Sequence, residues 1–433
     1  MQVMKWSVIA LAVAAGSTQM AVAANQSESK GFVEDSSLNI LNRNFYFNRN
    51  FKNRDPGTQN YREEWAHGVI AEYASGFTQG TVGFGVDAYG YLGLKLDSGK
   101  GRAGTGLLPI GSDGHAQDSY GEAGGAVKMR LSATELKYGE MRTAAPVFAT
   151  GDSRLLPETA TGFLVTSSEL EGLTAEAGHF TAYNNRNSTN SDDELLVNYG
   201  GGEAGKTIDF VGGVYGITDD LSVSLYGADF DESWTQFYGN ANYNIALAED
   251  QALNFDFNLY RTDDTGDALQ GEIDNTTWSL AAAYSIGAHK FTLAHQRVHG
   301  DTPFDYVGGD SIFLANSVQY SDFNAPEEKS FQARYDLNMA TFGVPGLVLT
   351  ARYIKGFDID GTNADASGGY AGVYGEDGEH WERDLQAKYT VQDGAAKDLN
   401  FTVRHAVHRA NDDQAEGDLD EVRLIVQYPL EIL

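Results

Sequence analysis

The chain has 433 residues, no cysteine and a formal net charge of −31, and these properties exclude several classes of protein. A strongly acidic chain is a poor partner for nucleic acid, and without cysteine it has neither disulfides nor a thiol nucleophile. Fifty glycines, 23 tyrosines and 22 phenylalanines against 8 prolines favour many strands joined by tight turns.

The first 24 residues have the layout of a secretory signal peptide. A lone cation, Lys5, precedes an apolar stretch at 6–15 and a small-residue segment that ends in Ala23 and Ala24. The apolar stretch is much shorter than the roughly 20 residues that a membrane-spanning helix needs. We therefore expect export, cleavage of residues 1–24, and a mature chain, residues 25–433, that forms a single domain.

Short segments in which apolar and polar residues alternate follow one another along the mature chain. In residues 82–96 the even positions are mainly aliphatic or aromatic, and the odd positions carry Gly, Asp, Tyr and Lys. A period of two predicts a strand with one apolar and one polar face. The predicted strands are 38–49, 67–75, 82–96, 126–134, 135–140, 173–181, 208–215, 221–229, 234–244, 253–260, 277–285, 290–298, 315–323, 330–337, 347–355, 384–391, 399–408 and 421–428.

This series of strands predicts an all-β fold, an antiparallel transmembrane β-barrel of about 18 strands, because a bilayer admits only helices or closed sheets. Short connections such as 218–220 and 392–395 alternate with long ones such as 97–122 and 358–382. A soluble β-sandwich of this length would need several domains with linkers, and a β-helix would need a regular repeat. The sequence shows neither, so the polar face is expected to line a pore.

Strand parity places cations on the face opposite the apolar one. A cation that faces lipid near the midplane costs about 2–4 kcal/mol, so these side chains belong in the lumen. They are Lys95, Lys128, Arg130, Lys137, Arg334, Arg352, Lys388, Arg404 and Arg423. We expect them to form a basic ladder that guides anions along the pore. The alternative is that they pair with the inward acids and only hold the wall; those acids are Asp87, Asp336, Asp384 and Glu421.

Two long segments are expected to fold into the lumen, because a cylinder of 18 strands is otherwise too wide for selectivity. The first, 144–162, is apolar for an external loop and contains two prolines, and the second is 303–316. The histidines of the last strands are a smaller feature. His408 shares the parity of Arg404, and we expect it at a polar rim rather than as a pH-dependent charge in the pore.

Several segments resemble the OprD-type outer-membrane carboxylate channels. They include FVEDSSLNILNRNFYFNR at 32–49, PVFATGDSRLLP at 146–157, PFDY at 303–306 and HWERD at 380–384, together with 167–173, 315–323 and 421–430. The resemblance spans the mature chain. It implies an eighteen-stranded channel that two inward-folded loops narrow, with a basic ladder facing an acidic residue of the later loop. Ladder members would include Arg334, Arg352, Lys388, Arg404 and Arg423, and the constriction-loop residues would be Arg154, Asp305, Tyr306, Asp310 and Ser311.

The sequence thus predicts a substrate-selective porin of a Gram-negative outer membrane, through which small carboxylate-bearing solutes diffuse passively. It offers no catalytic residue, metal site or cofactor motif, and no residue decides between basic amino acids and aromatic or other acids as permeants. Lipopolysaccharide is the expected neighbour of the acidic loops, and a monomer is expected by analogy.

The alternative function is an outer-membrane barrel enzyme, a protease or lipase with a site in its loops. Its best candidate residues are His295, His299 and Asp301. A purely structural barrel would not need a ladder of inward cations.

Overall fold

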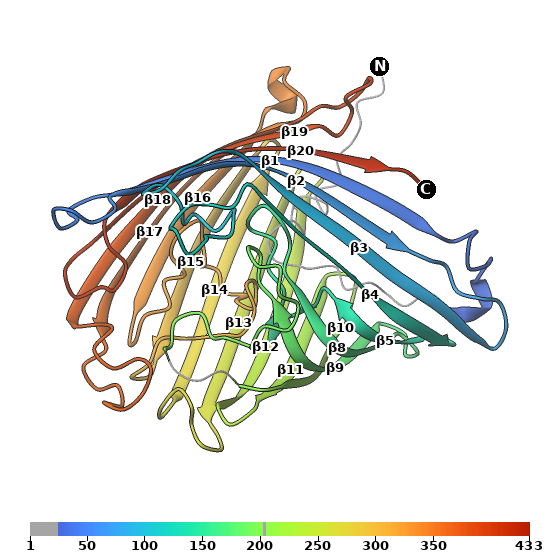
Figure 1. Ribbon diagram of the computed structural model, residues 1–433, viewed down its shortest axis with the longest axis horizontal. Coiled ribbons are helices and arrows are strands. Elements are labelled where there is room, and N and C mark those ends of the chain that lie inside the picture. Colours follow the sequence, from blue (N-terminus) through green and yellow to red (C-terminus); the bar gives the residue numbers. More distant parts are fainter. Residues whose placement is uncertain (1–24, 202–204) are drawn as a thin grey trace.

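The fold is described from a computed structural model, for residues 25–201 and 205–433. The predicted signal peptide, residues 1–24, lies outside the described residues. Eighteen strands form one antiparallel sheet that closes on itself as a tilted barrel (Figure 1). Closure joins the first strand to the last, with Asn39 opposite Glu431 at one end of the pairing and Phe51 opposite Leu419 at the other. The predicted antiparallel β-barrel is therefore confirmed.

The barrel strands in chain order are β1 (Ser37–Phe51), β2 (Tyr61–Ala74), β3 (Val82–Asp97), β4 (Ser119–Leu131), β5 (Thr134–Met141), β8 (Thr159–Ser167), β9 (Leu173–Asn184), β10 (Ile208–Gly216), β11 (Leu221–Phe230), β12 (Trp234–Ala248), β13 (Gln251–Asp264), β14 (Asp274–Ile286), β15 (His289–His299), β16 (Lys329–Asn338), β17 (Leu347–Asp360), β18 (Glu376–Thr390), β19 (Asn400–Ala410) and β20 (Leu419–Glu431). The pair β6 (Ala144–Ala145) and β7 (Phe148–Ala149) forms a small separate hairpin, and η1 (Gln26–Glu28) and η2 (Met339–Phe342) are single 3₁₀ turns.

The outer face of the barrel is apolar and exposed. On β17, Leu349 and Tyr353 point outward, whereas Ile354 is buried on the inner face. Leu225 and Leu293 are 69% and 67% exposed. Such exposure of large apolar side chains is unfavourable in water but favourable where the barrel contacts lipid. Among the described residues, no helix is both long and apolar enough to cross a membrane.

The two ends of the barrel differ in the length of their connections. Short turns, such as 132–133, 249–250 and 287–288, lie at the end where β20 finishes. The opposite end carries the long loops, and in outer-membrane barrels such loops face the outside. Gln26 of η1 folds into the short-turn end, where its backbone N–H donates to the Ser132 carbonyl oxygen at 2.7 Å.

Three long loops fold inward and pack on the wall. The β5–β8 loop (142–158) and the β15–β16 loop (300–328) bury Phe148 and Phe304 in one apolar cluster with Tyr260 of β13. The β3–β4 loop (98–118) buries Leu107 in a second cluster with Phe47 of β1. The first two loops were predicted to enter the lumen, and the third was not.

One predicted strand is wrong and one real strand was missed. Residues 315–323 belong to the β15–β16 loop, where wall side chains take up the backbone donors that a strand would pair. Glu382 accepts the N–H groups of Tyr320 and Ser321, at 3.0 and 2.9 Å. The missed strand is β8, whose inner face carries Gly162 and half-buried Leu164, so that its alternation is weak. The two errors cancel in the strand count.

Candidate functional site

The basic side chains of the last strands lie in rows across the inner wall. Arg334 of β16 is directly opposite Arg352 of β17, and Arg404 of β19 is opposite Arg423 of β20. The second row continues across the barrel closure to Phe47 of β1. Because strands in such barrels tilt by about 35–45°, a row perpendicular to the strands climbs along the pore axis. These residues thus form a ramp of positive charge.

Most of the predicted ladder residues are paired with acids. The ion pairs join Lys95 to Asp118, Lys128 to Asp87, Lys137 to Asp87 and Glu135, Arg334 to Asp336, Arg352 to Asp384, and Arg423 to Glu421. The last three pairs have nitrogen–oxygen distances of 2.8, 2.5 and 2.5 Å. The four inward acids that the sequence offered as alternative partners of the cations all form such pairs. Much of the ladder's charge is therefore compensated within the wall.

Three ladder residues form no ion pair with the described part of the chain. Arg404 donates from Nε to the Gln386 amide oxygen at 2.7 Å. Arg130 donates to Gln26 at 3.0 Å and lies 4.0 Å from the Phe77 ring centroid. Lys388 is exposed on the inner face of β18. Among the described residues, no direct ion pair compensates the positive charge of these three side chains.

Sequence analysis missed several inward cations, namely Arg43, Arg49, Arg142 and Arg186. Arg43 and Arg49 share parity with Phe45 and Phe47, so the inner face of β1 resembles an apolar face in the sequence. The inward loops cover these rings, which explains why aromatic side chains occur inside the barrel. A search for cations on both faces of every strand would have found both arginines.

A cluster of guanidinium groups surrounds the Phe47 ring. Arg49, Arg154 and Arg423 lie 5.3, 5.3 and 4.7 Å from its centroid. Burial lowers the pKa of Arg154, and the positive charges of Arg423, Arg186 and Arg49 lower it further. The predicted loop residue Arg154 therefore joins the wall cations at the narrowed part of the lumen.

Asp310 is the acidic group that the β15–β16 loop brings to the constriction. Its side chain is exposed, and one carboxylate oxygen accepts the Asp152 N–H at 3.1 Å. Desolvation of the carboxyl between the loops raises the pKa of Asp310 to about 6, and the negative charges of Glu158 and Asp152 raise it further. Arg43 and Arg142 form ion pairs with Asp152, whose N–H donates to Asp310. Asp310 therefore lies where the wall cations meet the acidic groups of the loops.

The other predicted loop residues hold the loops in place. Ser311 is buried, and its hydroxyl accepts the Ala149 N–H at 2.6 Å, which clamps the two constriction loops together. Buried Asp305 accepts backbone N–H groups of Asn198 and Gly200, at 2.9 and 2.7 Å. The Tyr306 hydroxyl, also in the protein interior, donates to Asp322 at 2.8 Å. Ser311, which was expected as a constriction-loop residue with Asp310, is therefore buried between the two loops and does not face the lumen.

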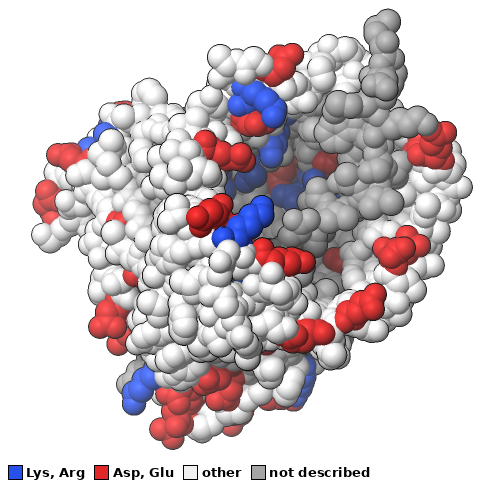
Figure 2. Space-filling model, turned by 90° about the vertical axis from the view of Figure 1, so that its right-hand side faces the viewer, with Lys and Arg blue, Asp and Glu red and all other residues white. Residues whose placement is uncertain are grey.

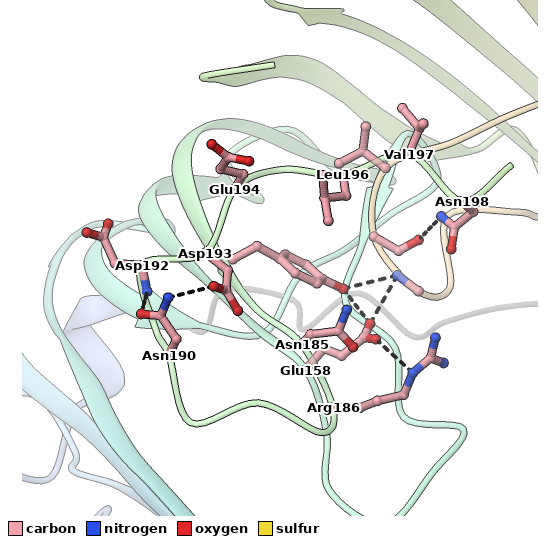
Figure 3. Close-up of a pocket in the computed structure, with 14 residues that line it drawn as sticks. Glu158, Asn185, Arg186, Asn190, Asp192, Asp193, Glu194, Leu196, Val197 and Asn198 are labelled. Atoms are coloured by element: carbon pink, nitrogen blue, oxygen red, sulfur yellow. Dashed lines mark hydrogen bonds and ion pairs between the residues drawn. The ribbon is translucent and has the colours of Figure 1, made fainter. Parts of the chain in front are cut away.

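An acidic cavity of about 560 Å³ opens between the β9–β10 loop (185–207) and the β15–β16 loop. Figure 3 shows Glu158 at its centre, with Arg186 pointing toward it; the two side chains are 3.5 Å apart. Asp192, Asp193 and Glu194 also line the cavity. Figure 2, which shows one end of the molecule, has Lys and Arg side chains gathered inside the hollow and Asp and Glu side chains mostly around it.

β12 and β13 form a wall whose inner face carries two charged side chains, Asp256 and, at the end of β13, Asp264. Tyr238 donates to the Asn258 amide oxygen at 2.6 Å, and Asn240 donates to Asp256 at 2.9 Å. Asn254 donates to Asn244 at 2.9 Å. This wall, which we call the amide wall, satisfies its polar groups internally.

The structure does not assemble the residues of the enzyme alternative. His295 faces outward, and its ring stacks on Phe331 at a centroid distance of 4.2 Å. His299 is exposed at the end of β15. Among the described residues, no hydrogen bond or ion pair joins either histidine to Asp301.

A closed barrel with an apolar outer face and a charged, loop-narrowed lumen defines an outer-membrane channel, a porin. Residues 30–432 match the outer membrane porin, OprD family, and the chain belongs to this family. It is a channel for small solutes in the outer membrane.

Two relatives and their structures place the chain within this family. Porin D of Pseudomonas aeruginosa is 60% identical over 448 residues, which cover 100% of both chains. The crystal structure of the outer membrane protein OprD from Pseudomonas aeruginosa is 57% identical, covers 95% of this chain and 98% of its own, and superimposes with a TM-score of 0.84. Pseudomonas aeruginosa OpdK, solved with vanillate, is 36% identical over 93% of this chain and 100% of its own, with a TM-score of 0.83.

Proposed function

We propose that this porin selects small carboxylate-bearing solutes and passes them by passive diffusion along the basic ramp. The main support is the juxtaposition of Arg334, Arg352, Arg404 and Arg423 on neighbouring strands, where the row ends at the arginine cluster around Phe47. A carboxylate can exchange from one guanidinium to the next without a strong single site. Weak binding at several sites allows a permeant both to enter and to leave.

The unpaired and paired cations have different roles in this proposal. Arg404, Lys388 and Arg154 offer positive charge that no acid of the described chain neutralises by an ion pair, so they attract the carboxylate. Arg130 does the same near the short-turn end. The paired residues orient the wall, set its potential and can exchange their acid partner for a passing carboxylate; they are Lys95, Lys128, Lys137, Arg334, Arg352 and Arg423.

The acidic side of the constriction selects for a second group on the permeant. Asp310 faces the lumen at the boundary described above, and Glu158 with Asp192 and Asp193 lines the cavity beyond it. A solute with a carboxylate and a separate positive group fits both sides. Asp305, Tyr306 and Ser311 contribute by holding the loop that carries Asp310.

Several further properties belong to the same proposal. The chain transports without catalysis, cofactor or bound metal in its permeation path. It is exported with cleavage of residues 1–24, and residues 25–433 act as one domain and as a monomer. The acidic external loops lie beside lipopolysaccharide, where divalent cations screen their charge.

The test is the reversal potential of the refolded porin in a planar bilayer under a salt gradient. Arg404→Gln removes one positive charge from the ramp, and Asn244→Asp adds one negative charge to the amide wall while keeping the acceptor for Asn254. The proposal predicts a shift toward cations in Arg404→Gln and Arg352→Ala that exceeds the shift in Asn244→Asp. Equal shifts would show that net charge, rather than the ramp, sets the selectivity, and a sealed wild-type barrel would reopen the enzyme alternative.

A further inference from the structure

A histidine pair lies outside the basic ramp, near the long-loop end of the barrel. His380 of β18 and His408 of β19 are buried, and His380 Nδ1 is 2.9 Å from His408 Nε2. The carboxylate of Glu416, in the β19–β20 loop (411–418), is 3.8 Å from each of these two nitrogens. The sequence predicted His408 at a polar rim, and the structure instead buries it between two strands and a loop.

The outer nitrogens of the two rings already have acceptors. His380 Nε2 is 2.8 Å from a Glu328 carboxylate oxygen, and His408 Nδ1 is 3.0 Å from the Gly417 carbonyl oxygen. Each outer nitrogen therefore carries the proton of a neutral ring, and each inner nitrogen has a lone pair. Two lone pairs and a carboxylate oxygen then point at the same space.

The spacing of the three atoms fits a small divalent cation. Zinc–nitrogen bonds of about 2.0–2.1 Å in a tetrahedron separate neighbouring ligand atoms by about 3.3 Å. The observed separations are 2.9, 3.8 and 3.8 Å, so each differs from that value by about 0.5 Å or less. Small rotations of the two imidazole rings and of the Glu416 side chain, which is 18% exposed, would bring the three atoms to one ion.

The neighbouring groups resemble the support that protein metal sites use. A metal-bound histidine commonly donates its other N–H to a carboxylate or a carbonyl, as both rings do here. The Gln414 amide is 3.2 Å from His380 Nδ1 and is buried, so it can turn its oxygen toward an ion as a fourth ligand. Two nitrogens and one or two oxygens suit zinc and similar transition metals better than calcium or magnesium.

We propose that His380, His408 and Glu416 bind a divalent transition-metal ion of the zinc class. The ion would cross-link β18, β19 and the β19–β20 loop. It would also stiffen the β15–β16 loop, because the ring of Phe323 stacks on His380 at 4.2 Å and that of Tyr320 meets His408 edge-on at 4.9 Å. The site is separate from the permeation proposal, since none of the three ligands is a ladder residue.

The experiment is a zinc titration of the refolded, chelator-treated porin by calorimetry. Wild type is expected to bind one Zn²⁺ per chain at this site, and His408→Gln and Glu416→Gln are expected to weaken that binding at least tenfold. His405→Gln is the matched control, since His405 lies on the same strand but on the opposite face. Glu416 is in a loop, so its variant tests the site even if His408→Gln does not fold.

Cobalt provides a second measurement, because tetrahedral Co²⁺ with these ligands absorbs visible light and octahedral Co²⁺ absorbs far more weakly. Wild type and His405→Gln should show the tetrahedral spectrum, and Glu416→Gln should lose it. Zinc should also raise the unfolding temperature of wild type but not of Glu416→Gln. Equal zinc affinity in all variants would place binding on the acidic loops and overturn the proposal. Absence of binding would leave a shared proton between the histidines as the explanation and would overturn it as well.

Discussion

The basic ramp and the amide wall are built from the same kind of strand but handle their inward polar groups in opposite ways. On the amide wall, Asn and Tyr side chains donate to Asn and Asp oxygens, as Tyr238 does to Asn258 and Asn240 does to Asp256. On the ramp, ion pairs such as that of Arg352 with Asp384 alternate with the unpaired Arg404. A wall whose polar groups are all hydrogen-bonded to one another offers little to a passing ion. A wall whose cations are only partly paired with acids can exchange an acid for the carboxylate of a permeant. Under the proposed function, this difference places the selectivity on one side of the lumen.

The largest effect is expected where the ramp holds a buried ion pair. Arg352→Met leaves the Asp384 carboxylate, which is 4% exposed, without its cation. Removal of one partner from a buried pair typically costs about 3–5 kcal/mol. We expect a lower urea midpoint for the folded barrel, measured by the gel mobility of unheated samples. The double variant Arg352→Met/Asp384→Leu should recover part of the loss, and Arg404→Met, which breaks no ion pair, should lose much less.

The anchor of the constriction loop comes next. Asp305→Asn replaces an acceptor of several backbone N–H groups, among them that of Gly200 at 2.7 Å, with an amide that presents its own N–H. Unsatisfied buried groups cost about 1–3 kcal/mol each. The β15–β16 loop should loosen, and single-channel conductance should rise while ion selectivity, set by the ramp, changes little. An unchanged conductance would show that the apolar packing of Phe304 holds the loop without Asp305.

A smaller effect is expected from pH. The pKa of Asp310 is raised to about 6 from 3.8, so this carboxyl takes up a proton as the pH falls from 7 to 5. The lumen then becomes less negative, and the anion-to-cation permeability ratio should rise severalfold. Because the pKa of Asp310 is higher in the folded protein, protonation of this group stabilises the fold. The stabilisation is greatest below about pH 4 and is lost as the pH rises through 6.

Asp310→Asn should show the low-pH selectivity already at pH 7 and a flat profile, whereas Asp192→Asn, a change in another acid of the same mouth, should keep the pH response. Persistence of the response in Asp310→Asn would assign it to a different group.

The smallest effect is expected on the amide wall. Tyr238→Phe removes only the hydroxyl that donates to the Asn258 amide oxygen, which keeps its hydrogen bond from Asn240. The loss of a neutral hydrogen bond costs about 0.5–1.5 kcal/mol. We expect a slightly lower urea midpoint and an unchanged reversal potential. A selectivity change as large as that of Arg404→Gln would mean that permeants contact both walls, and the contrast drawn above would fail.

The parts of this fold that the sequence predicts are those that local physics determines. Lipid on one face and water on the other impose alternation on each strand independently, so strands such as β17 and the inward parity of Arg352 follow from a few neighbouring residues. The inward position of Lys388 and Arg404 follows in the same way. Whether these residues carry permeants stays a prediction.

Contacts between distant segments explain what the sequence missed. The β3–β4 loop enters the lumen because Leu107 meets Phe47, and nothing near either residue indicates the other. Residues 315–323 alternate like a strand, but Glu382, far along the chain, takes their backbone donors. The approach of Glu416 to His380 and His408 likewise depends on how a loop folds over the end of two strands.

The pairing of β1 with β20 also determines at which stage of folding the barrel can close. Phe51 and Leu419 are opposite each other although nearly the whole chain separates them, and contacts between such distant positions are slow to form. Until the final strand is in place, the sheet has two free edges, each with a row of unpaired N–H and C=O groups. A chain that stops short of residue 419 therefore cannot seal, and its two edges would bind strands of other molecules. The last 13 residues of the sheet act as the closing seam of the whole barrel.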